Sequence, residues 1–494
     1  MGIALPVAPP AEPVVATAVV LWRDGPAGRE VLLVRRGEAR RFAGGFHAFP
    51  GGRLDPQDGS TPVPGLDAEA ARLLACAARE LFEETGVLLA RGRERLPAAA
   101  RDEARTALLE DRTTFAAVLA AHRLEIDPAL LAPAGRWITP AHLPLRYDAR
   151  MYLARLPAGE RAEVWPGELA GGGFLPAHQA LARWERGELL LHPPNWWGVS
   201  AVAGEAPPSA EAMRAPPWCE GFVARRVEFQ RGIFMAALRT PTLPPATHTN
   251  AWLVDLGGGL AVVDPGSPYA DEQARLLALL DELARDGLPP REIWLTHGHQ
   301  DHVGGVGALA RARGLPVRAH PLAAARLPSG LDLRPVREGD LLSGRWLALA
   351  TPGHARDHLV FLDERSGAAL CGDMVSTLST IVIDPPEGDM AEYERQLERL
   401  RGLSPRTLYP GHGPPAPDAP ARLAAYLAHR HEREALVEAA LAGGGTLDAI
   451  TARAYADTPA PFHPVAARSA LATLEKLAAD GRARRDGDRW STLP

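Results

Sequence analysis

Three histidines and an aspartate stand within six positions of one short stretch of this sequence. His297, His299, Asp301 and His302 directly follow the apolar run 293–295. Residues two apart in an extended segment point the same way, so the first two histidines can bind one metal ion, while the aspartate and the last histidine can serve a second ion once the chain turns. The alternative, a histidine-rich surface loop, becomes implausible when the downstream residues are included.

Three later apolar runs each lead directly into another side chain that can bind a metal. Strands that deliver such side chains at their ends can bring them together at one edge of a sheet packed by helices. A glycine precedes each of these residues and permits close backbone approach. The three residues are His354, Asp373 and His412.

A separate group of acidic residues lies in the N-terminal part of the chain. Segment 68–82 is rich in Ala and Leu and lacks Gly and Pro, which predicts a helix. Glu80, Glu83 and Glu84 have the spacing i, i+3 and i+4, which places them on one face near the helix end. Carboxylates at this density suit Mg²⁺ or Mn²⁺ acting with substrate phosphates. The alternative is a solvated acidic face.

Strands and helices must position both groups. Runs 14–22 and 31–34 are β-branched and apolar and predict two strands ahead of the acidic helix. Segment 250–266 predicts a β-hairpin, and 272–285 predicts an amphipathic helix that leads to the histidine motif.

Length and composition limit the possible classes of protein. At 494 residues, and with about 150 residues per domain, the chain predicts roughly three domains. The net charge of −6 offers no electrostatic footprint for nucleic acid. The three cysteines form neither a CxxC pair nor a disulfide framework, which suits a reducing cytoplasm. The sequence also predicts neither a signal peptide nor a membrane span.

The composition divides the chain into five segments. Residues 1–13 predict a disordered tail, and residues 205–222, which contain two proline pairs, predict an interdomain linker. The three remaining segments, 14–204, 223–415 and 416–494, are predicted to fold.

The acidic helix resembles the signature of the Nudix hydrolases. Residues 79–87 match its REUxEExGU part, and residues 49–52 match the segment that opens it. The first glutamate of that signature has no clear counterpart here, because an insertion separates Gly52 from the helix. The resemblance implies an α/β/α domain, a pairing of Arg79 with a glutamate, and a Mg²⁺ or Mn²⁺ site formed by Glu80, Glu83 and Glu84, with Glu83 also catalytic.

Residues before the helix are similar to the coenzyme A diphosphatase branch of that family. Segment 32–37 and Arg41 follow the order and spacing of the branch signature, although Val34 and Gly37 depart from it. The resemblance implies that Arg36 and Arg41 bind a substrate related to coenzyme A.

The histidine motif and the three later ligands resemble the metallo-β-lactamase superfamily, including the glyoxalase II and lactamase-like endoribonuclease groups. The resemblance implies an αββα sandwich and a pair of Zn²⁺ ions that share a water. The pKa of that water would fall toward ~7, giving a hydroxide nucleophile that Asp301 orients. By this resemblance His297, His299 and His354 hold one ion, Asp301, His302 and His412 hold the other, Asp373 bridges both, and Asp264 supports the motif.

The segment 416–494 shows winged-helix order and is similar to the tail of a mitochondrial lactamase-like endoribonuclease. Its basic hairpin is placed to contact phosphates. Aspartates interleave with its arginines, so a structural cap on the catalytic domain is an alternative. The arginines are Arg482, Arg484, Arg485 and Arg489, and the histidines predicted to be surface or packing residues are His429, His431 and His463.

Three hypotheses of function follow. In the first, the C-terminal half hydrolyses a thioester or related ester, and the Nudix half cleaves a coenzyme A-like or nucleoside diphosphate. In the second, the protein is an endoribonuclease that acts on single-stranded RNA. In the third, the Nudix half senses a ligand without catalysis.

Overall fold

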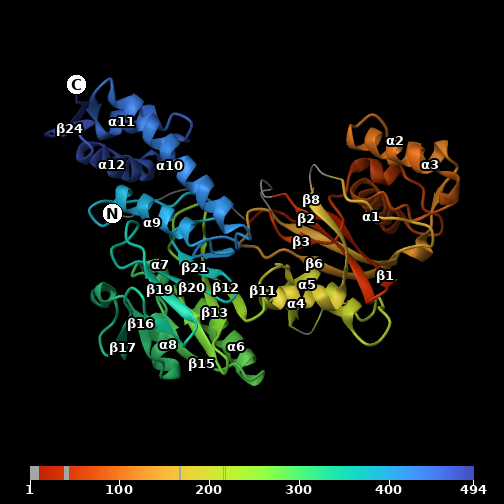
Figure 1. The fold of residues 1–494 in the computed structure, drawn as a ribbon, viewed down its shortest axis with the longest axis horizontal. Coiled ribbons are helices and arrows are strands. Elements are labelled where there is room, and N and C mark those ends of the chain that lie inside the picture. Colours follow the sequence, from red (N-terminus) through yellow and green to blue (C-terminus); the bar gives the residue numbers. More distant parts are fainter. Residues whose placement is uncertain (1–9, 38–43, 166–168, 215, 217, 494) are drawn as a thin grey trace. The chain divides into compact units, whose positions relative to one another are not determined.

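A computed structural model of the chain (Figure 1) describes residues 10–37, 44–165, 169–214, 216 and 218–493. Two units, Pro10–Arg231 and Gly232–Pro494, have their own cores and are treated separately. Most of the predicted disordered tail lies outside the described residues. No helix of the described chain is both long and apolar enough to cross a membrane.

The N-terminal unit is built on a mixed sheet. Its strands are β1 (Val14–Gly25), β2 (Gly28–Arg36), β3 (His47–Ala48), β6 (Ala132–Ile138), β7 (Tyr147–Arg155) and β8 (Leu169–Pro176). They run in the order β3-β2-β1-β7-β6, and β8 also pairs with β2. The β1–β7 pair is parallel, from Val14 opposite Tyr147 to Trp22 opposite Arg155. This parallel pair at the centre explains why β1 is almost continuously apolar.

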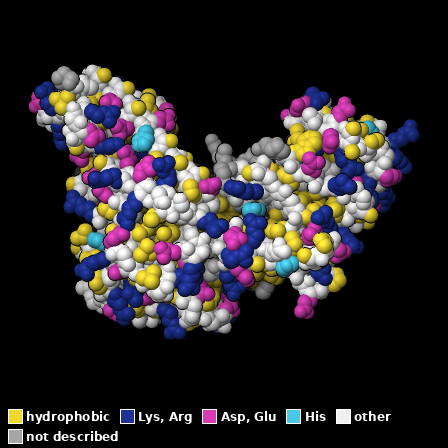
Figure 2. All heavy atoms as spheres, in the orientation of Figure 1, with side chains coloured by type: hydrophobic (Ala, Val, Ile, Leu, Met, Phe, Trp, Pro, Cys, Tyr) yellow, Lys and Arg dark blue, Asp and Glu magenta, His cyan; other side chains and the backbone are white. Residues whose placement is uncertain are grey.

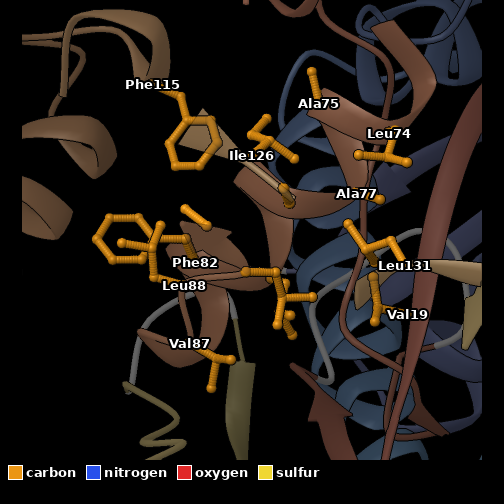
Figure 3. Packing of buried hydrophobic residues seen from close by; sticks show 14 of the residues in the cluster. Val19, Leu74, Ala75, Ala77, Phe82, Val87, Leu88, Phe115, Ile126 and Leu131 are labelled. Atoms are coloured by element: carbon orange, nitrogen blue, oxygen red, sulfur yellow. The ribbon is translucent and has the colours of Figure 1, made fainter. Parts of the chain in front are cut away.

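Helix α1 (Ala68–Thr85) carries the acidic motif. The Asp67 side chain accepts a hydrogen bond from the backbone N–H of Ala70 and caps the helix, and Gly86 ends it in a left-handed conformation with φ of 72°. Its apolar face packs into the core shown in Figure 3, where Phe82 lies 5.9 Å from the ring of Phe115. The other helices of this unit are α2 (Ala98–Leu109), α3 (Phe115–Ala121), α4 (Ala177–Glu185) and α5 (Pro193–Ala203).

The segment 205–222, predicted as a linker, packs against the N-terminal unit. The Arg29 guanidinium donates to the carbonyl oxygen of Ala206 at 2.6 Å, and the backbone N–H of Ile138 donates to the carbonyl oxygen of Phe222 at 2.8 Å. The proline-rich composition that suggested a linker therefore belongs to an irregular segment of the folded unit.

The second unit contains two large sheets and a small three-stranded sheet near its C-terminus. The strands of the first sheet, β12 (Ile233–Arg239), β13 (His248–Asp255), β14 (Leu260–Val263), β15 (Pro290–Trp294), β16 (Val317–Ala319) and β17 (Leu333–Pro335), follow one another in sequence order. The strands of the second sheet, β18 (Leu341–Leu342), β19 (Trp346–Ala350), β20 (Leu359–Asp363), β21 (Ala368–Gly372) and β22 (Thr407–Pro410), do the same.

Aromatic side chains join the two sheets face to face. The ring of Trp294 on β15 lies 6.1 Å from that of Trp346 on β19 and 5.2 Å from that of Phe361 on β20. Helices α6 (Ala270–Arg285) and α8 (Val306–Arg313) pack on the first sheet, and α9 (Met390–Gly402) packs on the second. The result is the predicted αββα sandwich.

The C-terminal elements are attached to the second sheet and α9. They are α10 (Ala419–Leu441), α11 (Leu447–Ala454), α12 (His463–Ala479) and the strands β23 (Gly445–Thr446), β24 (Ala483–Asp486) and β25 (Arg489–Thr492). Lys476 of α12 forms ion pairs with Glu394 of α9 and Glu434 of α10. Figure 1 shows α10 leading from the sandwich to these helices.

Candidate metal centre

The histidine motif lies where β15 ends. The chain passes from Trp294 through His297 to the short helix α7 (Gln300–Val303), whose first turn carries Asp301 and His302. A side chain at Gly266 would lie 1.7 Å from the carbonyl oxygen of Asp301, so only glycine allows the neighbouring loop to approach. This contact fixes the loop in which four of the predicted ligands lie.

Three histidines form the first group of facing donors. The Nδ1 atom of His299 lies 3.1 Å from Nε2 of His297 and 3.0 Å from Nε2 of His354. His297 and His354 are buried, whereas His299 is only partly buried. All three have one ring nitrogen pointing at a common position, as the ligands of one ion require.

A second group of donors lies beside the first. His412 Nε2 is 3.5 Å from Asp301 Oδ2, and His302 Nε2 is 4.0 Å from the same oxygen. Asp373 lies between the groups: its Oδ1 is 3.5 Å from His302 Nε2 and 3.4 Å from His412 Nε2, whereas its Oδ2 is 3.5 Å from Nε2 of His354. The structure thus brings all seven predicted ligands together, with Asp373 facing both groups.

The donor set fits a pair of divalent cations. His302 Nε2 and Asp373 Oδ1 are buried and have no hydrogen-bond partner, which is costly unless a cation binds them. A side chain at Gly411 would lie 2.7 Å from the His302 ring and 2.8 Å from Asp373 Oδ1, so glycine keeps this space open. Imidazole nitrogens with carboxylate oxygens suit Zn²⁺ and related transition metals.

Burial and neighbouring charges shift the pKa values of the ligands. Burial lowers the pKa of His297 well below its usual range, and burial beside His299 lowers the pKa of His354 to about 4. Burial opposes the charged form of His302 as well, yet Asp373 and the other nearby carboxylates raise its pKa well above the usual value. His297 and His354 are therefore neutral donors at neutral pH, while positive charge is favoured at His302.

Residues behind the ligands fix their orientation. Asp264 Oδ2 accepts from His302 Nδ1 at 2.8 Å and from the Thr296 hydroxyl at 2.6 Å, which agrees with its predicted supporting place. Glu387 Oε2 lies 3.5 Å from His299 Nε2, and its Oε1 pairs with Arg326 at 2.6 Å. A hydrogen bond from His299, opposed by partial burial, holds the pKa of Glu387 at about 2. Such partners set the tautomer and basicity of a metal-binding histidine.

His358 acts on the backbone of the centre. Its Nε2 accepts from the backbone N–H of Asp373 at 3.1 Å, and its Nδ1 lies 2.8 Å from the Thr351 hydroxyl. Sequence reasoning missed both Glu387 and His358. The short repeat of histidines at 354 and 358 was a usable signal for His358, but nothing around Glu387 distinguishes it from a surface acid.

The donors open into a cavity of about 740 Å³. Its lining includes His299, Asp301 and the loop 241–246, and also residues of α10 and α12. His429 of α10, predicted as a surface or packing residue, lines this cavity. A substrate in the cavity would contact the donors and the C-terminal helices at the same time.

The predicted Nudix site is organised around a buried arginine. Arg79 Nη1 donates to Glu80 Oε1 at 3.0 Å and to Glu83 Oε2 at 3.1 Å. Glu84 accepts from the backbone N–H of Gly51 at 2.9 Å. Among the described residues, every group of donors that converges closely enough for one ion lies in the second unit. The three glutamates therefore share a helix face, as predicted, but Arg79 holds two of them and they do not converge.

Burial changes the ionisation of these carboxyl groups. It raises the pKa of Glu80 to about 7, an effect that the charge of Arg79 only partly offsets, and it also raises the pKa of Glu83. A side chain at Gly52 would lie 2.4 Å from the Glu80 carboxyl group, so this glycine permits the close packing that desolvates it.

The first glutamate of the Nudix signature has no clear counterpart in the sequence, and in the structure Asp58 supplies an acid in its place. It stands six residues after Gly52, in the short 3₁₀ helix Pro56–Ser60, and is buried. Arg79 Nε donates to Asp58 Oδ1 at 2.7 Å and its Nη2 donates to Oδ2 at 3.0 Å. Burial alone would lower the pKa of Arg79, but the bonds to Asp58 and the charges of Glu80 and Glu83 raise it. The insertion therefore follows the acid and does not replace it.

Of the two arginines predicted to bind substrate, only Arg36 is among the described residues. Arg36 is the last residue of β2, and its backbone N–H donates to the carbonyl oxygen of Phe46 at 3.1 Å. Arg41 lies outside the described residues.

Comparison with known families identifies the domains. The NUDIX domain family matches residues 12–156, the Metallo-beta-lactamase superfamily matches 244–412, and the Beta-lactamase associated winged helix domain matches 446–490. The chain joins a Nudix domain to a metallo-β-lactamase domain. Both matched families are families of hydrolases, and the third match identifies the C-terminal winged helix. The two resemblances drawn from the sequence motifs are confirmed.

Individual relatives cover one half of the fusion at a time. Lactamase-like protein adaB of Aspergillus niger is 32% identical over 199 residues, which are 39% of this chain and 58% of that protein. Beta-lactamase-like protein 2 homolog of Caenorhabditis elegans is 28% identical over 241 residues, 47% of this chain and 79% of that protein. A solved NUDIX hydrolase from Alicyclobacillus acidocaldarius is 32% identical and covers 41% of this chain and 96% of its own, with a TM-score of 0.36.

Proposed function

We propose that the metallo-β-lactamase half of the fusion uses two Zn²⁺ ions to hydrolyse a thioester or related ester. The observation that carries this proposal is the convergence of seven donors beside a cavity that five of them line. When bound, such ions lower the pKa of water toward ~7 and polarise a carbonyl oxygen. Zn²⁺ is favoured because five of the seven donors are imidazoles.

The side chains of the centre have separate tasks in this proposal. Asp301 lines the cavity and accepts a hydrogen bond from the attacking water, which fixes the direction of attack. Asp264 holds the tautomer of His302, because it accepts from the opposite ring nitrogen at 2.8 Å. Water attacks the acyl carbon, the bond to sulfur or oxygen breaks, and the proton of the water passes to the leaving thiol or alcohol.

For the Nudix half we propose cleavage of a coenzyme A-like or nucleoside diphosphate with Mg²⁺ or Mn²⁺. The buried Asp58–Arg79 pair supports this, since it retains the acid of the family signature. Glu83 would act in catalysis once the cation displaces Arg79 from it. The fact that Arg79 bonds both Glu80 and Glu83 favours a second candidate, a ligand-sensing module without catalysis.

Two variants test both halves in the full chain. Turnover of S-acyl thioesters, coenzyme A and single-stranded RNA is measured for the wild type, His299→Ala and Glu83→Gln. We expect His299→Ala to abolish thioester hydrolysis alone and Glu83→Gln to abolish diphosphate cleavage alone. Diphosphate cleavage that survives Glu83→Gln would refute a catalytic Nudix half, and RNA as the only substrate lost in His299→Ala would refute the ester proposal.

Metal content gives an independent test. Elemental analysis of the purified protein is expected to give two zinc ions per chain, and His299→Ala is expected to lose at least one. Fewer than two transition-metal ions in the wild type would contradict a binuclear centre.

A further inference from the structure

The C-terminal region contributes one wall of the cavity above the donor cluster. Phe462, Val465 and Ala466, from the start of α12 and the turn before it, line the cavity together with Tyr455. Phe462 and Val465 are only partly buried, so their side chains have surface left for a ligand. This wall belongs to the C-terminal winged-helix domain. In the sequence, it lies far from the motifs that contain the predicted metal ligands.

The wall is fixed to the metallo-β-lactamase sandwich. The Ser469 hydroxyl accepts from the backbone N–H of Ile383 at 3.2 Å, and Arg468 pairs with Asp384 at 3.1 Å. The segment that holds Ile381 and Asp384 lines the cavity as well. Two segments that line the cavity are therefore bonded to each other.

The charges in this wall are already paired. Arg433 donates to Asp457 at 2.9 Å, and Arg468 is held by Asp384. The buried Arg430 donates to the carbonyl oxygen of Ile381. An RNA strand would require free cations along its phosphates, and these arginines are committed to protein partners.

One arginine at the start of the wing shows the same pairing. Arg482, predicted to contact phosphates, donates from Nε to Glu438 at 3.0 Å and also pairs with Glu434. On the visible face of this region, basic and acidic side chains are interspersed (Figure 2). The mixture of acidic and basic side chains agrees better with a structural cap on the catalytic domain than with a surface that binds nucleic acid.

Part of the cavity lining is apolar. Leu243 and Pro245 come from the loop after β12, Ile381 comes from the loop after β21, and Phe462 and Val465 face the same space from the C-terminal side. An apolar patch of this kind can contact the apolar part of a small substrate, and the volume of about 740 Å³ lies within the roughly 300–1,000 Å³ that small-molecule pockets span.

We infer that the winged-helix region is the specificity wall of the hydrolase, and that Phe462 and Val465 select an ester or thioester with a medium-length apolar acyl chain. This inference rests on the proposed ester hydrolysis. The donors hold the carbonyl end of the substrate, while the acyl chain lies between the loop 241–246 and the C-terminal helices. Water adds to the carbonyl carbon, and a fatty acid and a thiol leave.

The test compares acyl-chain length in the full, metal-loaded chain. Rates of thiol release from acetyl, butyryl, octanoyl and decanoyl thioesters of N-acetylcysteamine are measured for the wild type, Val465→Trp and Phe462→Ala. Val465→Trp narrows the cavity and is expected to lower the octanoyl-to-acetyl ratio of kcat/KM by about tenfold or more, because one displaced methylene already changes such ratios by about tenfold. Phe462→Ala is expected to lower the same ratio by about threefold through lost contact.

The control is Leu436→Ala, which removes an exposed leucine from α10 and leaves the cavity lining intact. Its ratio is expected to equal that of the wild type. Melting temperatures of all variants show whether a change reflects misfolding, and Phe462→Ala keeps the test valid if the larger tryptophan does not fit.

Binding of the product separates this inference from the proposed activity. Titration calorimetry with octanoate is expected to give at least tenfold weaker binding for Val465→Trp than for Leu436→Ala, whether or not thioesters turn over. The inference would be refuted if folded Val465→Trp and Leu436→Ala bound octanoate with equal affinity and the octanoyl-to-acetyl ratio of kcat/KM were the same in all variants. Cleavage of single-stranded RNA that depends on Arg484 and Arg489 would overturn it as well, in favour of a nucleic-acid surface.

Discussion

The two acids behind the histidine ligands allow a graded test of the metal centre. Asp264 is buried and lies 2.8 Å from His302 Nδ1, whereas Glu387 is partly exposed and lies 3.5 Å from His299 Nε2. Loss of a partner of this kind typically weakens metal binding by about 10- to 100-fold. The shorter bond and deeper burial place Asp264 at the upper end of this range and Glu387 at the lower end.

Asp264→Asn is therefore expected to weaken zinc binding by about 100-fold, or about 2.7 kcal/mol, and Glu387→Gln by about tenfold, or about 1.4 kcal/mol. The asparagine amide cannot accept from His302 and from both the backbone and hydroxyl of Thr296 in the way the carboxylate does. Affinity is measured by competition with a chromophoric chelator, so the readout does not depend on activity.

The matched control for this test is Glu364→Gln, which changes an exposed glutamate in the same unit. It is expected to bind zinc as the wild type does. The reasoning would be refuted if Glu387→Gln weakened binding more than Asp264→Asn, or if all three variants matched the wild type.

Three further outcomes are expected. Asp58→Ala leaves the Arg79 guanidinium buried with fewer carboxylate partners, and should lower the free energy of unfolding of the Nudix unit by about 3 kcal/mol in urea titrations. Asp58→Glu should recover part of this loss. An unchanged unfolding midpoint in Asp58→Ala would contradict the pairing. Binding of Mg²⁺ by calorimetry should strengthen from pH 6 to pH 8, because the cation competes with a proton on Glu80, whose pKa is about 7; a flat profile would exclude Glu80 as a ligand. Removal of zinc with a chelator should lower the melting temperature of the second unit, and added zinc should restore it.

The sequence predicted the site correctly where several of its residues lie in one short segment. His297, His299 and His302 lie within six positions, and strands that end in ligands define the sheet edge on which they meet. Glu80 and Glu83 likewise share one helix, so their common face follows from helical spacing. The sandwich and the separate Nudix domain follow from these motifs together with the resemblances they carry.

The parts that failed depend on contacts between distant segments. Proline-rich residues 205–222 look like a linker, but the carbonyl oxygens of this stretch bond to Arg29, which no local pattern indicates. His429 was predicted to be a surface or packing residue because it lies outside every motif, and only the fold shows that it lines the cavity. Glu387 has no motif of its own, and only the fold brings it near His299.

Both halves of the fusion place a buried carboxylate behind the residues that the motifs name. Asp264 lies behind His302, and Asp58 lies behind Arg79. In each case the buried carboxylate fixes the orientation of the imidazole or guanidinium in front of it. This carboxylate comes from a different segment of the chain than the residue it holds. Many backbone routes can deliver a carboxylate to such a position, so its place in the sequence is weakly constrained. The insertion after Asp58 lengthens the path to the helix and leaves the bond to Arg79 intact.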